Sequence, residues 1–173
     1  NTCMGVNALT SCTSGASNTA IGRNCLDANT TGGSNTGLGY AALTSCTTGA
    51  DNVGIGFECL EDLTTSDNNV AMGKRAGMNV TTGANNTLIG HLNNDSLTTG
   101  SNNVSVGYNN DVDTGDAGSR FTFGTSLSAT AGNTIKIGNG STFITNTWGS
   151  NATWSHSSDE RLKENIEDNS LGL

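Results

Sequence analysis

Polar and apolar positions recur along this chain with a constant period of 17 residues, the length of the first block from Asn1 to Ser17. The chain from Asn1 to Ser119 divides into seven such blocks without insertion or deletion: NTCMGVNALTSCTSGAS, NTAIGRNCLDANTTGGS, NTGLGYAALTSCTTGAD, NVGIGFECLEDLTTSDN, NVAMGKRAGMNVTTGAN, NTLIGHLNNDSLTTGSN and NVSVGYNNDVDTGDAGS. We number the positions of a block as columns 1 to 17. Column 1 is always Asn and column 5 is always Gly. Column 2 is Thr or Val, and column 4 is Met, Ile, Leu or Val. Such agreement indicates a structural repeat.

The length of the repeat selects the fold class. Helical repeats need about 33 residues or more per unit, whereas 17 residues suit one coil of a parallel β-solenoid or β-roll with two short strands and two turns. We therefore predict an all-β chain with a seven-coil solenoid over 1–119, a β-rich junction over 120–157 and the start of a further segment over 158–173. At about 4.8 Å per coil, seven coils would rise about 33 Å.

Alternation along the strand predicts which side faces inward. Successive side chains point to opposite sides, so the apolar columns 2 and 4 are expected to fill the coil interior. The small columns 3 and 5 are then expected to face outward and allow another backbone to approach. A second strand would add columns 8, 9 and 12 to the interior. Column 1 would form a ladder of Asn amides along the stack, and Gly or Asn with positive φ would form the turns.

A coil this thin buries little by itself, which indicates association. Three identical chains packing their small-residue sides around an axis would close the structure. We therefore expect an intertwined homotrimer.

Composition narrows the classes of function. The chain of 173 residues has 24 Gly, no Pro and a net charge of −8. Because of this charge, nucleic acid and anionic membranes are poor partners. No apolar run is long enough to span a bilayer, and no signal peptide opens the chain. The sequence begins inside the repeat pattern, so we expect it to be a segment of a longer protein. Nothing in the sequence calls for a cofactor.

The chain has five cysteines, Cys3, Cys12, Cys25, Cys46 and Cys59, and the four in columns 8 and 12 are predicted to be small buried apolar residues. Cys12 and Cys46 share column 12 two coils apart, and Cys25 and Cys59 share column 8. Two coils span roughly 9.6 Å, which is too far for a disulfide. There is no Cys-x-x-Cys pair to suggest a metal site. Reduced thiols suit a protein that is assembled in a cytoplasm.

Larger side chains follow the last complete block at Ser119. The stretches RFTFGTSL and NTIKIGNGSTFITNTW alternate like strands, and they contain Phe121, Phe123 and Phe143. This change favours a different packing, such as a triple β-helix in which strands of three chains wind together. We interpret Trp148 and Trp154 as core residues at this transition rather than as a ligand platform.

The charged end of the sequence, HSSDERLKENIED, has the features of a helix start. Leu162 and Ile166 are spaced i, i+4, and Ser157 with Glu160 has the spacing of a capping box. On this interpretation the segment begins a short C-terminal helix and carries no chemistry.

The stretch SDERLKENI also resembles the opening of the self-cleaving intramolecular chaperone at the C-terminus of phage tail fibres and tailspikes, endosialidases among them. The repeats are similar to the head repeats of trimeric bacterial adhesins, which are left-handed parallel β-rolls. In the chaperone family a Ser-Asp-x-x-Leu-Lys motif marks an autocleavage site. The resemblance implies a cut between Ser158 and Asp159 after trimerisation, with Ser158 as nucleophile and Lys163 as base. Arg161 could lower the pKa of that lysine.

The family's chaperone continues for many tens of residues past this motif, whereas the present sequence ends at Leu173. We therefore expect single-turnover cleavage only when the full chaperone is present, and no enzymatic activity in the fibre part.

These observations predict a structural protein: the distal shaft or tip of a trimeric phage or virus fibre. It would be assembled in the host cytoplasm and carried on the virion. Its partners would be two identical chains and, for host attachment, a glycan or protein receptor on the host surface.

The alternatives are a trimeric bacterial adhesin head and an ice-binding solenoid, suggested by the Thr-Thr pairs of columns 13 and 14. A glycan-cleaving tailspike would need paired carboxylates, and the acidic residues do not cluster in that way. SDERLKENI favours the fibre over the adhesin. Asp111, Asp113 and Asp116 are candidate calcium ligands, although their spacing differs from that of an EF-hand.

Overall fold

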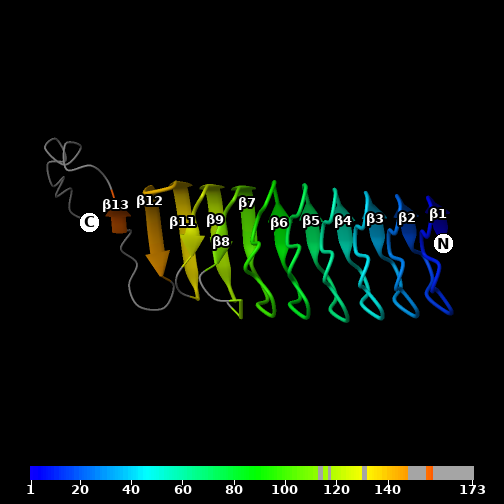
Figure 1. The fold of residues 1–173 in the computed structure, drawn as a ribbon. Coiled ribbons are helices and arrows are strands. Elements are labelled where there is room, and N and C mark those ends of the chain that lie inside the picture. Colours follow the sequence, from blue (N-terminus) through cyan, green and yellow to red (C-terminus); the bar gives the residue numbers. More distant parts are fainter. Residues whose placement is uncertain (113–114, 117, 130–131, 148–154, 158–173) are drawn as a thin grey trace, which may run out of the picture.

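The chain folds as a stack of β-coils. The computed structural model describes residues 1–112, 115–116, 118–129, 132–147 and 155–157, and these contain strands and turns but no helix. The coils follow one another along a single axis (Figure 1). The predicted all-β parallel β-solenoid, with one coil for each sequence repeat, is confirmed.

One large sheet runs through the whole stack. Its order is β1-β2-β3-β4-β5-β6-β7-β9-β11-β12-β13. The bounds are β1 Thr2–Met4, β2 Thr19–Ile21, β3 Thr36–Leu38, β4 Val53–Ile55, β5 Val70–Met72, β6 Thr87–Ile89, β7 Val104–Tyr108, β9 Arg120–Thr125, β11 Thr134–Asn139, β12 Thr142–Thr147 and β13 Ser155–Ser157. A second, two-stranded sheet joins β8 Asp111–Val112 to β10 Ser128–Ala129.

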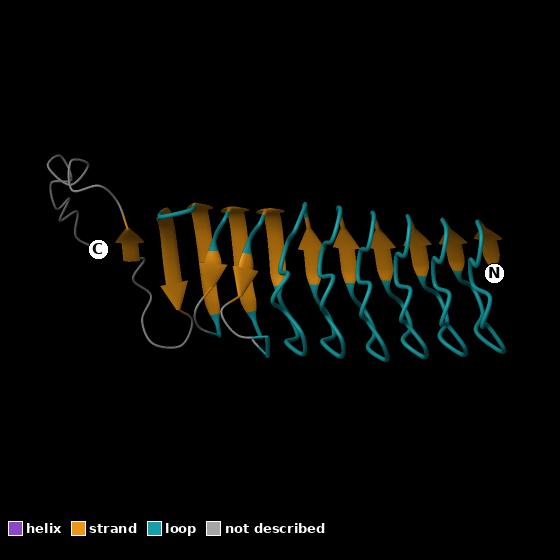
Figure 2. Cartoon of the chain, viewed as in Figure 1, coloured by secondary structure: helices purple, strands orange, loops and turns teal. Residues whose placement is uncertain are grey.

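Pairing is parallel from β1 to β11, and equivalent columns meet across the strands. The sheet continues past the end of the strict repeat, because β9 pairs with β7 in the same chain. At the end of the stack β12 runs antiparallel to β11, and β13 antiparallel to β12. Figure 2 shows these strands on one side of the coils and the turns below and opposite them.

The inward and outward sides of the strands are the reverse of the prediction. Column 3 is buried in β2 to β7: Ala20, Gly37, Gly54, Ala71, Leu88 and Ser105. Column 4 lies on the outer side, where Leu38 and Met72 are each 44% exposed. The small-residue side is therefore inside the coil and cannot be the contact between chains that we had expected.

The reason for the reversal is the narrowness of the coil. The rest of the coil already fills the interior with the large side chains of columns 9 and 12, such as Leu43 and Leu63. A Cβ added to Gly54 would lie 3.0 Å from Cγ of Leu43, and one added to Gly37 would clash with the Cys25 thiol. Only small residues fit column 3 in these coils, so the apolar column 4 must face outward.

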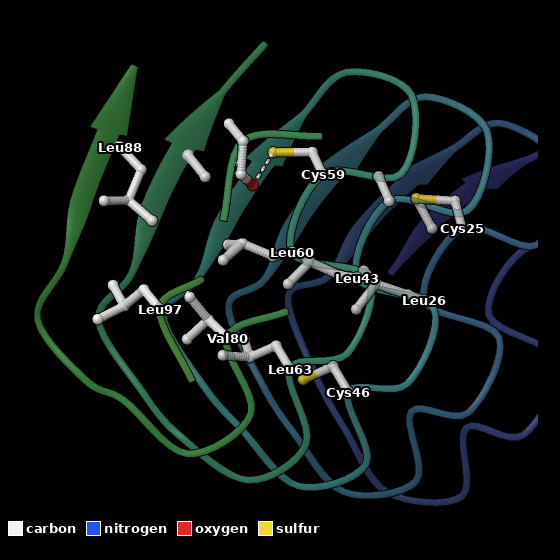
Figure 3. Close-up of a cluster of buried hydrophobic side chains, with 14 of the residues drawn as sticks. Cys25, Leu26, Leu43, Cys46, Cys59, Leu60, Leu63, Val80, Leu88 and Leu97 are labelled. Carbon is white, nitrogen blue, oxygen red and sulfur yellow. Dashed lines mark hydrogen bonds between the residues drawn. The ribbon is translucent and has the colours of Figure 1, made fainter. Parts of the chain in front are cut away.

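The opposite wall is buried, as predicted, but in the first six coils it is not a strand. Leu26, Leu43 and Leu60 are fully buried and stack in a row from coil to coil (Figure 3). Their φ angles of 51°, 54° and 50° are left-handed, so this wall consists of turns. Backbone hydrogen bonds still join the coils, as from Leu26 N–H to the Ala42 carbonyl at 3.1 Å. The predicted second strand is therefore absent from the first six coils and appears only as the short β8 of the seventh coil, which pairs with β10.

The predicted Asn ladder is present in column 1. Asn52 donates its backbone N–H to Oδ1 of Asn35 at 3.0 Å, and its Nδ2 donates to the same oxygen at 3.1 Å. Nδ2 of Asn52 also donates to the Ser66 carbonyl at 2.8 Å. Because Asn18 to Asn103 of this column are all buried, the ladder satisfies polar groups that water cannot reach.

All five thiols are free. Cys25, Cys46 and Cys59 are fully buried, which confirms their predicted role as small core residues. Burial raises the pKa of the Cys25 and Cys46 thiols to about 11 and that of Cys59 to about 12. Cys3 is exposed and Cys12 is half-buried in the first coil.

Candidate interaction face

A continuous row of apolar side chains runs along the outer side of the large sheet. Each member is the direct cross-strand partner of the next, from β1 to β12. We call this row the apolar ridge; it consists of Met4, Ile21, Leu38, Ile55, Met72, Ile89, Val106, Phe123, Ile137 and Ile144. Its members remain half-buried or exposed, with Phe123, Ile137 and Ile144 each 37% exposed.

A second row, column 2, lies beside the ridge on the same face. Its members are also aligned partners across the strands: Thr2, Thr19, Thr36, Val53, Val70, Thr87, Val104, Phe121 and Ile135. The first three are Thr, and five of the remaining six are apolar. The apolar face therefore becomes wider toward the C-terminal end of the stack.

The apolar side chains of this face are contiguous, whereas apolar residues scattered singly over a surface are normal. Ten strands at about 4.8 Å span about 43 Å, and the two rows together offer roughly 500 Å². Soluble monomers rarely expose contiguous apolar patches larger than a few hundred Å². The face is therefore a candidate interaction surface.

Acidic residues are excluded from this side of the molecule. Columns 2, 4 and 6 of the seven repeats contain no Asp or Glu, although the chain has 15 of them. Two molecules that each carry a net charge of −8 could meet here without placing carboxylates against each other.

Aromatic and basic side chains of column 6 stack along one border of the face. The rings of Tyr40 and Phe57 are stacked with centroids 5.0 Å apart and an interplanar angle of 15°. Arg23 lies 5.9 Å from the Tyr40 centroid, and Lys74 lies 5.8 Å from the Phe57 centroid. Since neighbours cover the ring faces, the row stabilises the coils and presents mainly ring edges outward.

The two Thr columns do not share a face. Thr47 is half-buried, and its Oγ1 donates to the Thr64 carbonyl at 3.2 Å, whereas Thr48 is exposed. The same contrast holds for Thr64 and Thr65. A flat surface made of both Thr columns, which an ice-binding function would use, is therefore not formed by these pairs.

The acidic stretch after β7 places one of its carboxylates on the short strand β8. Asp111 accepts hydrogen bonds from Ser96 N–H at 2.9 Å and from Ser96 Oγ at 2.7 Å, which fastens two coils together. Asp116 is exposed, and Asp113 lies outside the described residues. Within the described part of the chain, no three His, Cys, Asp or Glu side chains gather as a metal site.

The predicted cleavage motif lies outside the described residues, so its geometry stays a prediction. This holds for Ser158, Asp159, Arg161 and Lys163. The tryptophans at 148 and 154 and the predicted helix start also lie outside.

Sequence reasoning missed the apolar ridge because it placed column 4 inside. The volume of the side chains in the other columns could have revealed it. Columns 8, 9 and 12 already supply large side chains such as Leu60 and Leu63, and so short a coil has no room for a second large apolar column opposite them.

No family model matches the chain, and no curated protein or solved structure matches it significantly. The described part of the chain contains no helix with the length and apolarity to cross a membrane. The fold itself defines the class, a parallel β-solenoid of repeating coils with an apolar outer face.

Proposed function

We propose that this chain is a self-associating structural protein, the distal shaft or tip of a trimeric phage or virus fibre that holds or presents a host-binding surface. The observation that carries the proposal is the apolar ridge, which extends from β1 to β12 and has no partner within the chain's own described fold. Its partners would be two further copies of the chain. The small-residue side no longer supports this association, because it is buried inside the coil.

A second copy fits the ridge better than an unrelated partner does. The ridge presents one apolar side chain per strand at a spacing of about 4.8 Å. A copy of the same chain carries apolar side chains at the same spacing over the same length. Burying roughly 500 Å² on each chain would contribute about 12 kcal/mol per chain. This is of the order of the entropic cost of association, so lateral contact along most of the ridge is needed.

The number of chains and the viral context come from the sequence resemblance. The repeats are similar to blocks found in trimeric fibres and adhesin heads, and SDERLKENI resembles the cleavage site of fibre chaperones. On this proposal Ser158 and Lys163 cut the chain before Asp159 once the full chaperone has directed assembly. The mature solenoid would then remain on the virion and contact a host glycan or protein.

The mass of the assembled protein tests the proposal. Light scattering coupled to size-exclusion chromatography should give three times the chain mass of 17.6 kDa. A monomer or a dimer over the whole concentration range would contradict it. Changing Leu38 to Asp on the ridge should dissociate the trimer, and changing the exposed Thr48 to Asp on another side should not.

A further inference from the structure

We infer that the column 6 row binds a linear carboxylated polysaccharide, which would lie along the stack with its carboxylates on Arg23 and Lys74. We call this row the basic-aromatic strip; it consists of Arg23, Tyr40, Phe57, Lys74, His91 and Tyr108. The inference rests on the proposed function and deepens it, because it names the surface and the class of glycan through which the fibre would contact its host.

The whole strip is open to an external ligand. All six side chains are exposed, and they follow the axis along which the coils stack in Figure 1. Tyr40, Phe57 and Tyr108 are 40%, 41% and 49% exposed. Members of the strip come from consecutive coils and recur at the strand spacing of about 4.8 Å, which is comparable to the length of one pyranose ring. A linear chain of sugars can therefore contact several coils without bending.

The two cations of the strip have no carboxylate partner in the part of the chain that the structure describes. Arg75, on the neighbouring column, forms an ion pair with Glu58 at 2.6 Å, and Arg120 is buried. Arg23 and Lys74 are instead exposed, and each lies near an aromatic ring of the strip. Their charges are therefore available to an anion from outside the chain.

The rings between these cations add to the positive potential. Tyr40 and Phe57 are stacked with an interplanar angle of 15°, so their faces cover each other and their edges point outward. An aromatic ring is negative on its faces and positive at its edge. Arg23 and Lys74 flank the stacked pair and leave the edges free for a ligand. The strip thus presents cations and positive ring edges, which favours a carboxylated sugar chain over a neutral one.

The charge of the remaining surface favours this position for an anionic ligand. The chain has a net charge of −8, whereas columns 2, 4 and 6 of the repeats contain no Asp or Glu. Glu58, which follows Phe57, is neutralised by Arg75. A polyanion is therefore repelled less along this face than over the surfaces that carry the carboxylates.

The spacing of the cations sets the length of the ligand. Arg23 and Lys74 lie three coils apart, which corresponds to about 14 Å along the stack. One monosaccharide cannot reach both side chains. A chain of several sugars can, and its second contact then gains from the high effective concentration that the first contact creates.

The covered ring faces favour a polysaccharide over a single-stranded nucleic acid. Nucleobases bind such strips by stacking on free aromatic faces. Neighbours occupy the faces of Tyr40 and Phe57 here. Sugar hydroxyls and carboxylates need only the cations, the ring edges and the Tyr40 hydroxyl, which can donate and accept hydrogen bonds.

Binding of an immobilised oligogalacturonate to the whole chain tests the inference by biolayer interferometry. Binding should weaken as the ionic strength rises from about 0.1 M to about 1 M, because the Debye length falls from about 10 Å to about 3 Å. The methyl ester of the same oligosaccharide, which has the same backbone without charge, should bind at least about tenfold more weakly. Equal binding of the ester would overturn the role of the carboxylates.

Two double variants with the same change in net charge locate the site. Arg23→Gln with Lys74→Gln should weaken binding about tenfold, since each exposed ion pair contributes roughly threefold. Thr48→Asp with Thr65→Asp alters two exposed positions of column 14 and should weaken binding less than about threefold. Equal losses would mean that overall charge, and not the strip, governs binding. Far-UV circular dichroism shows whether each variant is folded.

The remaining outcomes separate this inference from the proposed function. An assembled trimer that does not bind oligogalacturonate overturns the strip as a glycan site and leaves the fibre proposal intact. A monomer that binds through Arg23 and Lys74 overturns the proposed assembly and leaves the strip intact. A single-stranded oligonucleotide of equal charge that binds as tightly would overturn the assignment to a polysaccharide.

Discussion

Gly39 lies directly against Gly56 of the next coil. A Cβ added to Gly39 would clash with the Gly56 carbonyl oxygen and lie 2.7 Å from its carbonyl carbon, and the φ of Gly39 is +141°. The same contact recurs between the column 5 glycines of consecutive coils, such as Gly22 with Gly39. Column 5 is therefore invariant in the seven repeats for a backbone reason: no side chain fits where the coils approach most closely.

This contact predicts the effect of substituting Gly39. Gly39→Val should destabilise the solenoid by several kcal/mol, because it adds both steric overlap and backbone strain. Gly33→Ala is the control, since Ala occupies that column in other repeats and the change there should be nearly neutral. Thermal unfolding followed by circular dichroism compares the two, and similar melting temperatures would contradict this explanation.

The buried amide of Asn29 predicts a stabilising change. Asn29 is fully buried in column 12, and its amide has no nitrogen or oxygen partner, only the weakly hydrogen-bonding thiol of Cys46 beside it. In coils 4 to 6 this column holds Leu63, Val80 and Leu97. Asn29→Val should raise the free energy of unfolding by about 1–2 kcal/mol, because it removes an unsatisfied buried amide. Asn29→Asp should lower it, and a destabilised Val variant would show that the amide has a partner in solution.

The Asn ladder predicts a large loss at Asn52. Its Oδ1 accepts from the buried Asn69 N–H at 2.9 Å, and its Nδ2 donates to the Ser66 carbonyl at 2.8 Å. Asn52→Ala should cost about 2–4 kcal/mol, because it leaves several buried polar groups unpaired. Thr48→Ala, on an exposed position of a nearby coil, should cost less than about 0.5 kcal/mol. Chemical denaturation measures both, and equal effects would argue against the ladder as a source of stability.

The buried thiols predict loss of stability in alkaline solution. Burial raises the pKa of Cys25 to about 11 and that of Cys59 to about 12, from 9.0 when unfolded. The unfolded chain therefore loses these protons first as the pH rises. The stability from the neutral thiols is complete below pH 9 and is lost as the pH rises through 11 to 12.

The double variant Cys25→Ala, Cys59→Ala tests this dependence, because Ala8, Ala42 and Ala76 occupy the same column. Denaturation measured between pH 8 and roughly 11 should show a flatter decline for the variant than for the parent. Parallel declines would mean that other groups set the alkaline limit.

The terminal motif predicts a single cut. In a chain extended through the full chaperone, the parent should separate between Ser158 and Asp159, and both Ser158→Ala and Lys163→Ala should remain intact. Ser157→Ala is the control for the capping-box interpretation, which expects a stability loss of about 1 kcal/mol and no change in chain length. Intact-mass measurement distinguishes the variants, and cleavage of Ser158→Ala at the parental rate would disprove the dyad.

Periodicity was sufficient to predict the solenoid, the Asn ladder and the buried columns 8, 9 and 12. Periodicity alone could not say which side of a short strand faces inward, because alternation is symmetrical between the two sides. The side chains opposite decide this, as Leu43 does at Gly54. The turns at Leu26 and Leu43 were also missed, since Leu rarely adopts positive φ and the hydrogen bonds between coils hold it there.

The shortened coil at 120–133 shows where this architecture tolerates change in length. Phe123 pairs with Val106 of the coil before it and with Ile137 of the coil after it. The step from Val106 to Phe123 is one full repeat, whereas the step from Phe123 to Ile137 is shorter than a repeat. The sheet stays aligned, so the difference in length falls in the connection between β10 and β11 and not in the strands. Connections between strands can therefore change in length while the strands and the apolar ridge keep their spacing along the stack.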